Sequence, residues 1–408
     1  MNVVDAGATA HRGVASVPKG KRKRLLRGAL LAYAFILPSF VVLLAFRLYP
    51  VARAAYISLH KWGIKKDFFV GLKNYLTLFT DPRFYKSFNV TVFYVIVTVP
   101  ITMALSLLVA YLLFQKIRYR PVFRTLYFIP YITSLVPAAI VWGWIFNYEA
   151  GILNHALHWL SDGLATILLT AGVRPWVYVW MAIGAIWLIY VVVTYKRRGG
   201  IANGVLVLLS GGLLALGLFL NLRPEIIEPV ANQLATFFPV KWLQEPRGII
   251  QYLGKRLAFD PPKWLWGPSM ALVAVSIVSI WHFLGYDVVV YLAGLGNIPP
   301  SLYEVARIDG ASEGQAFWYI TLPLLTPTTF FLLIISTVGA FRAFTLFYVM
   351  TGGGPLKTTT SVAYFIFDRF WNAARVGYAS AAAFVLFGII LIMTMVQQKA
   401  MGKRVTYQ

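Results

Sequence analysis

Long stretches without charged residues constrain the fold of this chain more than any other feature of its sequence. A helix needs about 20 mostly apolar residues to cross the hydrocarbon core of a bilayer. Seven stretches of about that length or more carry no charge: 28–46, 87–115, 125–148, 175–195, 199–222, 264–286 and 376–398. An eighth stretch, 326–349, contains a single charged residue, Arg342. Since only 12% of the 408 residues are charged, too few for a soluble surface of this size, we predict an all-α membrane protein with about eight transmembrane helices.

The positions of the basic residues predict the orientation of these helices, because Lys and Arg concentrate in short cytoplasmic connections. Eight spans place both termini on the same side. If that side is the cytoplasm, the inner segments 1–27, 115–124, 195–199 and 399–408 hold 17 Lys or Arg in 52 residues, against 14 in 82 for the long outer segments 47–86 and 222–263. We therefore expect cytoplasmic termini. The first stretch is too long for a signal peptide and is interpreted as a retained anchor.

The formal net charge of +23 raises the question of nucleic-acid binding. The cations flank the apolar stretches and form no single basic domain, so membrane lipids with anionic headgroups are the simpler partner and we expect no nucleic acid. The chain has no Cys, which excludes disulfides, thiol catalysis and Cys-ligated metals.

One region after the third stretch differs from the rest. It contains a hydrophobic hairpin, 175–222, whose tight turn is the basic segment 196–200, and then a stretch of mixed charge with several prolines. A hairpin adds two spans, so it leaves the orientation of the later helices unchanged. We interpret 161–258 as an insertion.

The connection that follows the stretch 264–286 predicts two short cytoplasmic helices. Ser301 and Glu304 have the spacing of a capping box, and Ser312 and Gln315 repeat it. Gly310 falls where the first helix must end, a position that favours a residue able to adopt positive φ.

Two short helices joined by a glycine suit docking into a groove of a partner, with Phe317, Trp318 and Tyr319 as anchors. The alternative is an interfacial hairpin that lies on the headgroups, with Glu304 serving only as a cap. Periodicity alone does not separate these two interpretations.

The same connection carries a specific spacing of residues. Glu304-Val305-Ala306 is followed after three residues by Gly310, and after nine more by Ile-Thr-Leu-Pro at 320–323. This pattern resembles the EAA loop of permeases in binding-protein-dependent ABC importers, and its flanking residues resemble the sugar-importer branch of that family. Three further segments resemble outer elements of the same permeases: Phe-Val-Gly-Leu-Lys-Asn-Tyr at 69–75, Gly-Ile-Leu-Asn at 151–154 and Thr-Gly-Gly-Gly-Pro at 351–355.

The resemblance covers residues 28–160 and 260–398 and leaves the hairpin unmatched. The chain departs from the family pattern at Val305, where the family has Ala, and at Thr345, where relatives often have Asp. The second departure concerns the cavity, so it weakens any transfer of substrate identity.

The resemblance implies a type I ABC importer permease core of six helices, with the hairpin as an addition, in the bacterial plasma (inner) membrane. The implied division is a basic tail 1–27, core helices one to three in 28–160, the insertion 161–258, core helices four to six in 259–398 with the coupling loop 299–324, and a tail 399–408. The implied partners are a second permease, a cytoplasmic ABC ATPase dimer and an extracytoplasmic solute-binding protein.

In that family each EAA loop sits in a cleft of the ATPase, whose ATP-driven closure switches the permease pair from inward-open to outward-open. The resemblance assigns this coupling role to Glu304, Ala306, Asp309, Gly310, Ala311, Ile320, Leu322 and Pro323. The chain has no Gly-x-x-x-x-Gly-Lys-Ser/Thr phosphate loop, so ATP and Mg are expected on the partner ATPase. We predict no cofactor, metal or catalytic residue on this chain.

Two other classes of protein are alternatives. An ion-coupled secondary transporter would usually carry acids at membrane depth. Only Glu149 and Asp287 border an apolar stretch, Asp287 at its cytoplasmic end, so we expect no acid within a span. A membrane enzyme would need a cluster of acids or histidines, and the five histidines are scattered, with His155 and His158 more suited to capping than to metal binding.

Arg342 is the candidate for contact with the solute. A charge near the middle of a span costs about 2.5–3.5 kcal/mol on insertion scales, so Arg342 should not face lipid. Aromatic faces with a few polar groups suit a sugar ring, and the predicted substrate pathway comprises Phe341, Arg342, Phe344, Thr345, Tyr348, Trp281 and Tyr286. The alternative is that Arg342 binds carbonyls of a broken helix or pairs with the second permease.

Overall fold

The computed structural model describes residues 19–63, 67–115, 120–170, 240–256, 261–262 and 266–401, which are mostly helical. The first half contains α1 (Lys19–Leu43), the π-helical turn η1 (Leu44–Leu48), α2 (Tyr49–Ser58), α3 (Lys73–Thr80), α4 (Pro82–Phe114), α5 (Arg120–Ile132), α6 (Leu135–Ile145) and α7 (Ile152–Thr170). Two short strands, β1 (His60–Lys61) and β2 (Phe68–Phe69), pair antiparallel with His60 opposite Phe69.

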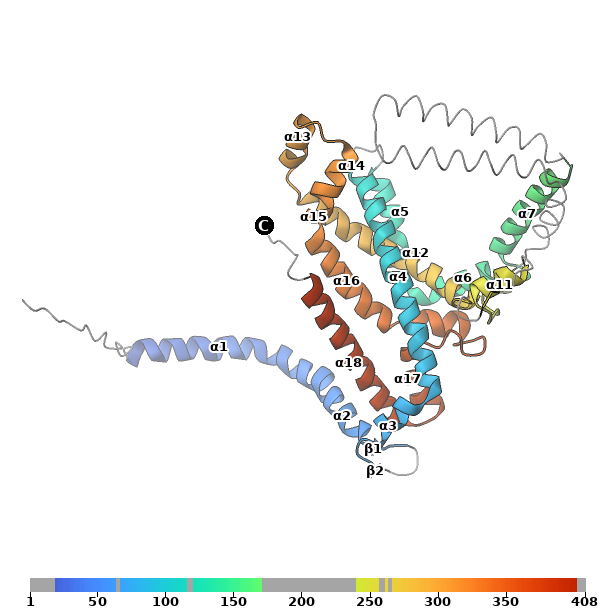
Figure 1. Cartoon of the computed structure of the whole chain (residues 1–408). Helices are drawn as coiled ribbons and strands as arrows, with labels where there is room; N and C mark the ends of the chain where they lie inside the picture. Colours follow the sequence, from blue (N-terminus) through green and yellow to red (C-terminus); the bar gives the residue numbers. More distant parts are fainter. Residues whose placement is uncertain are drawn as a thin grey trace, which may run out of the picture.

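The second half contains a series of long and short helices. These are α11 (Ile249–Arg256), α12 (Met270–Gly296), α13 (Pro300–Ile308), α14 (Glu313–Ala316), η4 (Phe317–Thr321), α15 (Leu322–Leu324), α16 (Thr326–Phe341), η5 (Phe347–Thr351), α17 (Val362–Phe367), η6 (Asp368–Asn372) and α18 (Val376–Met401). In Figure 1, α13 and α14 lie at one end of the bundle of long helices, and α3, β1 and β2 lie at the other.

The described residues include up to six membrane spans. Four helices are long and apolar enough to cross a bilayer: Leu30–Ser58, Pro82–Phe114, Met270–Gly296 and Val376–Ala400. Two bent pairs bring the number to six: Pro121–Ile132 with Leu135–Ile145, and Glu313–Leu324 with Thr326–Phe341. They follow the order of the predicted core stretches, so the all-α membrane architecture is confirmed. The hairpin predicted at 175–222 lies outside the described residues, and the predicted boundary at residue 160 falls within α7, so the domain division stays a prediction.

The first span is longer than predicted. The helix continues through η1 and α2 to Ser58 and does not end at Phe46. Arg47 lies within η1. A single charge ends an apolar stretch but does not end a helix, because Arg is a good helix former whose long side chain can reach water from a membrane helix.

The third predicted span, 125–148, is wrong as a single helix. It consists of α5 and α6, which meet at an angle of 97°. Pro137 explains the break, because a proline lacks an N–H group and its ring clashes with the carbonyl four residues earlier, here that of Thr133. Ser134 accordingly leaves the helical region, with φ −60° and ψ 134°. The Thr133 hydroxyl donates to the carbonyl of Pro130 (2.7 Å) and so satisfies one of the carbonyls at the end of α5.

The span predicted to end at Tyr286 continues to Gly296. Asp287 therefore lies inside α12, only 2% exposed, and not at a cytoplasmic end. The expectation that no acid lies within a span is wrong. An aspartate side chain does not interrupt the backbone hydrogen bonds of an α-helix, and the apolar run resumes at Val288.

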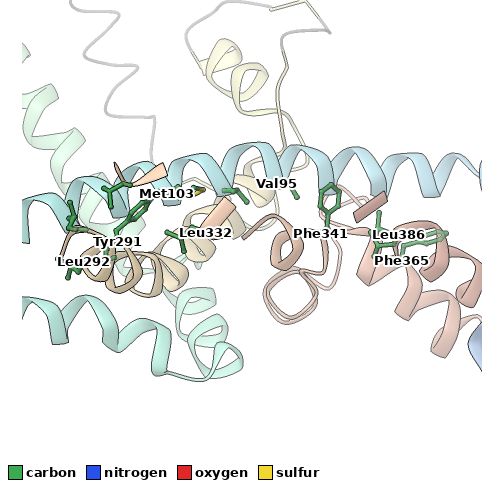
Figure 2. Packing of buried hydrophobic residues seen from close by; sticks show 14 of the residues in the cluster. Val95, Met103, Tyr291, Leu292, Leu332, Phe341, Phe365 and Leu386 are labelled. Carbon is green, nitrogen blue, oxygen red and sulfur yellow. The ribbon is translucent and has the colours of Figure 1, made fainter. Parts of the chain in front are cut away.

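The main core forms where α4 packs along α12, with α16, α17 and α18 completing it. Figure 2 shows members of this cluster from all five helices, including Val95, Met103, Tyr291, Leu292, Leu332, Phe365 and Leu386. Ser106 of α4 donates a hydrogen bond to the carbonyl of Leu284 in α12 (3.1 Å). Because lipid tails are as apolar as the core, close packing and such interhelical hydrogen bonds, rather than exclusion from water, hold membrane helices together.

The segment 69–75 connects the small sheet to the end of α2. The Asn74 Nδ2 donates to the carbonyls of Ser58 (2.8 Å) and His60 (2.9 Å). The hydroxyls of Tyr75 and Ser58 lie 2.8 Å apart. These bonds explain why Asn and Tyr stand together in this segment.

Asn154, which precedes the predicted insertion 161–258, bonds to residues within it. Its Oδ1 accepts from the N–H of Val240 (3.0 Å) and from the indole N–H of Trp242 (2.9 Å), and its Nδ2 donates to the carbonyl of Val240 (2.9 Å). Asn154 is buried. Asn154 therefore holds the start of α7 against residues 240–242, 86 residues or more further along the chain.

Replacing Gly285 with Ala should weaken the packing of α5 on α12. A Cβ atom at this position would collide with the backbone carbonyl oxygen of Tyr127, which cannot rotate away as a side chain does. We expect the free energy of unfolding to fall by roughly 1–3 kcal/mol, measured from thermal unfolding of the purified protein in nanodiscs. Gly388→Ala in α18 is the control, because a Cβ there meets no atom within 4 Å. Equal unfolding midpoints for the two variants would contradict the close contact.

Candidate functional site

The short helix α13 ends in a Schellman motif, which fixes the turn of the predicted coupling loop. Gly310 has φ +77°, as predicted. The N–H of Ala311 bonds to the carbonyl of Ala306 (2.8 Å), and the N–H of Gly310 bonds to that of Arg307 (3.1 Å). Ala306 and Ala311 are therefore held together by the backbone, and their spacing follows from the motif.

One of the two predicted capping boxes is present. The Ser312 hydroxyl accepts from the N–H of Gln315 (3.3 Å), and the Gln315 side chain accepts from the N–H of Ser312 (2.8 Å). The box predicted for Ser301 and Glu304 is wrong. The N-cap of α13 is Pro299, without a side-chain cap bond, so Ser301 already lies inside the helix and Glu304 is not part of a cap.

The loop is attached to the bundle on one side. The hydroxyls of Tyr303 and Thr321 lie 2.9 Å apart and link α13 to η4. Phe317 packs edge-on against Tyr111 of α4, with 4.8 Å between ring centroids. Ile320 packs against the main core. These contacts join the loop to the transmembrane helices.

The loop also exposes large apolar side chains among its exposed polar ones. Ile308 is 84% exposed and Tyr319 is 80% exposed, with Val305 and Trp318 also exposed. Of the eight predicted coupling residues, Glu304, Asp309, Gly310 and Pro323 are exposed, whereas Ala306, Ala311, Ile320 and Leu322 are partly buried. A groove of about 570 Å³ between the loop and the end of α4 is bordered by Glu304, Ala306 and Ala311.

A cavity of about 330 Å³ lies among α4, α5, α6, α12 and the end of α16. Four of the predicted pathway residues line it: Tyr286, Arg342, Phe344 and Thr345. Three do not: Phe341 is buried in the main core, Tyr348 stacks on Phe344 outside the cavity (5.3 Å between centroids), and Trp281 meets Trp142 edge-on (5.4 Å).

The stretch 326–349 predicted that Arg342 lies in the middle of a span, and this is wrong. Arg342 lies at a break in the helix. The helix α16 ends at Phe341, and Arg342 is its C-cap, with φ −93° and ψ 5°. The carbonyl of Ala343, which the break leaves free, accepts a hydrogen bond from the Ser361 hydroxyl (2.8 Å). The guanidinium is exposed, and no side chain within the described ranges forms a hydrogen bond or ion pair with it.

Two breaks in the helices border this cavity, one between α5 and α6 and one after α16. Tyr131 and Leu135 flank the break between α5 and α6, and Arg342 to Phe344 form the break after α16. Irregular backbone at membrane depth is tolerated where it is buried in protein or lines a cavity. The breaks bring aromatic and polar side chains together here, including Tyr131 and Tyr286 with 5.0 Å between ring centroids.

Several lining residues were not predicted. The most important is Asp287, whose Oδ2 is buried without a hydrogen-bond partner among the described residues. The Tyr94 and Ser279 hydroxyls lie 2.5 Å apart, and Thr98 and Thr102 follow on the same face of α4. The sequence signal for Tyr94, Thr98 and Thr102 was their spacing of four residues in the stretch 87–115, which places their hydroxyl groups on one helical face.

The structure offers no metal site in the part of the chain that it describes, where no three His, Asp or Glu side chains come together. His155 Nδ1 lies 3.0 Å from the carbonyl of Gly151, and His158 Nδ1 lies 3.1 Å from Asp162 Oδ2. Both histidines thus have partners on their own helix.

Comparisons with known proteins point to one family. Residues 166–407 match the family described as "Binding-protein-dependent transport system inner membrane component". A probable ABC transporter permease protein, YurN of Bacillus subtilis, is 26% identical over 374 residues, covering 91% of this chain and 95% of the relative. The trehalose/maltose transport system permease protein MalF of Thermococcus litoralis is 28% identical over 375 residues, covering 91% and 94%.

The fold resembles that of a solved structure, a bacterial ABC transporter involved in the import of the acidic polysaccharide alginate. The TM-score is 0.63 at 18% sequence identity, and the match covers 95% of this chain and all of that one. The likeness confirms the predicted type I permease fold.

Asp287 and Ser279 should respond in opposite ways to substitution. Ser279→Ala removes the partner of the buried Tyr94 hydroxyl, so we expect a loss of roughly 1–3 kcal/mol in the free energy of unfolding. Asp287→Asn removes a charge whose Oδ2 has no hydrogen-bond partner among the described residues and keeps the shape of the side chain, so the unfolding midpoint should stay unchanged or rise. Thermal unfolding in nanodiscs compares the two. A midpoint lowered by Asp287→Asn as much as by Ser279→Ala would mean that Asp287 has a structural partner.

Proposed function

Since the chain belongs to the family of inner-membrane components of binding-protein-dependent transport systems, we propose that it forms, with a second permease, the pathway by which a sugar enters the cell. The chain is a transport subunit of an importer. ATP and Mg are bound by a separate cytoplasmic ATPase dimer, and an extracytoplasmic binding protein delivers the solute.

The loop around Gly310 supports the coupling role. It is tied to α4 and to the main core, and it exposes several large apolar side chains. A partner that grips the surface formed by Val305, Ile308, Trp318 and Tyr319 would therefore move the transmembrane helices with it. Glu304, exposed beside this surface, supplies a polar contact for the ATPase.

Transport requires that the ATPase bind the two states of the permease pair unequally, because a ligand shifts an equilibrium only through its differential contacts. The ATPase dimer changes shape on binding ATP, and the two coupling loops follow it. The membrane cavity then opens alternately to the two sides. We place the termini and the coupling loop in the cytoplasm, and the opposite end, with β1, β2 and α3, outside.

The cavity supports a sugar as the solute. Tyr131, Tyr286 and Phe344 provide aromatic faces, and Arg342 and Asp287 provide a donor and an acceptor of hydrogen bonds. A pocket with apolar walls and a few polar groups is typical of small-molecule sites. The transport of trehalose and maltose by one relative and of alginate by the solved importer agrees with a saccharide.

Asp287 lies inside α12, so the absence of acids from the spans does not separate this chain from an ion-coupled transporter. Family membership does, since the family takes its solutes from a binding protein. Asp287 is then interpreted as a lining residue of the solute cavity.

The coupling role is tested by Gly310→Val. A β-branched residue with positive φ is strained by about 1–2 kcal/mol or more, while the space around Gly310 is open, so the backbone alone causes the effect. We expect uptake to be abolished and membrane insertion to be normal. Uptake is measured in proteoliposomes that hold the purified complex and internal ATP, with the saccharide that most stimulates ATP hydrolysis in a panel of maltose, trehalose and glucuronate.

Gly310→Asn is the matched control, because Asn adopts positive φ readily and should keep most of the uptake. Normal uptake by Gly310→Val would refute the coupling role of the loop. Uptake by this chain alone, without an ATPase, would refute the proposed function as a whole.

Arg342→Ala should change solute recognition without preventing assembly. Hydrogen bonds to a charged group contribute about 1.5–3 kcal/mol, so the concentration for half-maximal uptake should rise about tenfold or more. Co-purification with the ATPase measures assembly. Arg342→Lys keeps the charge, so the concentration for half-maximal uptake should rise less than in Arg342→Ala. Transport kinetics identical to those of the unchanged protein would remove Arg342 from the solute site.

A further inference from the structure

A second, basic pocket lies at the end of the bundle opposite to α13. It has a volume of about 390 Å³ and is formed by the start of α4, the turn at 352–357, α17 and η6. Four cationic side chains line it, namely Arg83, Lys86, Lys357 and Arg369, against one acid, Asp368. In Figure 1 this region, around α17, lies at the end of the bundle that also carries α3. The pocket is separate from the predicted coupling loop.

Arg369 forms the inner wall of this pocket. It is only 8% exposed, and its Nε is buried without a hydrogen-bond partner among the described residues. Its guanidinium lies 5.0 Å from the ring centroid of Phe365. The nearest acid is Asp368, whose Oδ2 lies 3.9 Å from Arg369 Nη2, too far for a hydrogen bond. A buried guanidinium with a free donor is costly unless an anion binds it.

The rim adds further positive charge. Lys86 Nζ donates to the carbonyl of Leu356 (2.7 Å), and Arg83 and Lys357 are exposed. No acid other than Asp368 lines the pocket within the described ranges. Four like charges around one small space repel one another, and an incoming carboxylate would relieve this repulsion. Arg and Lys also form the stronger, charge-assisted hydrogen bonds with carboxylates.

Aromatic side chains connect this pocket to the membrane cavity. Tyr364 lines the basic pocket, and Phe344 lines the cavity. Their rings stack with 6.0 Å between centroids, and Tyr348 and Phe367 contact both. Aromatic faces of this kind suit a saccharide ring, and the cavity at the other end of the series contains Arg342. This continuity favours an anionic group on the solute over an acidic side chain of a partner protein.

We propose that the pocket of Arg83, Lys86, Lys357 and Arg369 is an outer binding site for the carboxylate of an acidic saccharide on its way to the membrane cavity. The proposal rests on the proposed uptake function for its direction of transport. Binding at the pocket itself requires neither ATP nor uptake.

The experiment measures binding of three probes to the purified complex in nanodiscs, without ATP, by saturation-transfer NMR. The probes are D-glucuronate, D-glucose, which lacks the carboxylate, and acetate, which lacks the ring. We expect glucuronate to bind at least tenfold more tightly than either of the others. Arg369→Gln and the rim variant Arg83→Gln/Lys86→Gln should each weaken glucuronate binding about tenfold or more.

Lys73→Gln is the control, because Lys73 is at the same end of the bundle but lines a different pocket. It should bind glucuronate as the unchanged protein does. The rim variant alters exposed residues, so it tests the site even if Arg369→Gln fails to fold. Equal binding of glucuronate and glucose, or unchanged binding by the rim variant, would refute the site. Equal binding of acetate and glucuronate would refute its use of the saccharide ring.

The same complex separates this proposal from the proposed function. A complex that binds glucuronate at this pocket but takes up no saccharide with ATP would contradict the uptake role and support the anion site. A complex that takes up a saccharide normally but does not bind glucuronate selectively would support the uptake role and contradict the anion site.

Discussion

The need to satisfy every backbone hydrogen bond inside a bilayer governs this structure. Helices meet that need on their own, which is why the described chain crosses the membrane as helices. The two breaks, at Thr133–Ser134 and after Phe341, are possible because side chains take over the freed carbonyls, as the Ser361 hydroxyl does for Ala343. Both breaks border one cavity. At these two places the irregular backbone brings polar groups to the wall of the cavity.

The backbone of the predicted coupling loop is likewise held by hydrogen bonds within the chain. Its turn is fixed by the backbone bonds around Gly310, and its inner side is fixed by Phe317 against Tyr111. The rest of the loop is exposed and includes large apolar side chains, of which Ile308 and Tyr319 are the most exposed. A loop that merely lay on headgroups would not need this attachment to α4. This attachment favours docking to a partner over the interfacial alternative.

Charges are placed where they face water or the proposed path of the solute. Asp287 and Arg342 line the membrane cavity, and Arg369 lines the basic pocket at the other end of a series of aromatic rings. Each lacks a close hydrogen-bonded partner of opposite charge among the described residues. Charged groups left unpaired in this way cost stability, and they persist where binding requires them.

The sequence alone determined those features that depend on neighbouring residues. Six apolar stretches predicted the core spans in their order, Gly310 predicted a positive φ, and Ser312 with Gln315 predicted a capping box. Apolar length failed where it was used to place helix ends, because it measures transfer into lipid and not backbone hydrogen bonding. It therefore put Asp287 outside its helix.

Only the tertiary structure decided which distant residues meet. Asn154 bonds to Val240, 86 residues away, and two separate breaks converge on one cavity. No local pattern encodes these distances, because they result from the packing of whole helices against one another.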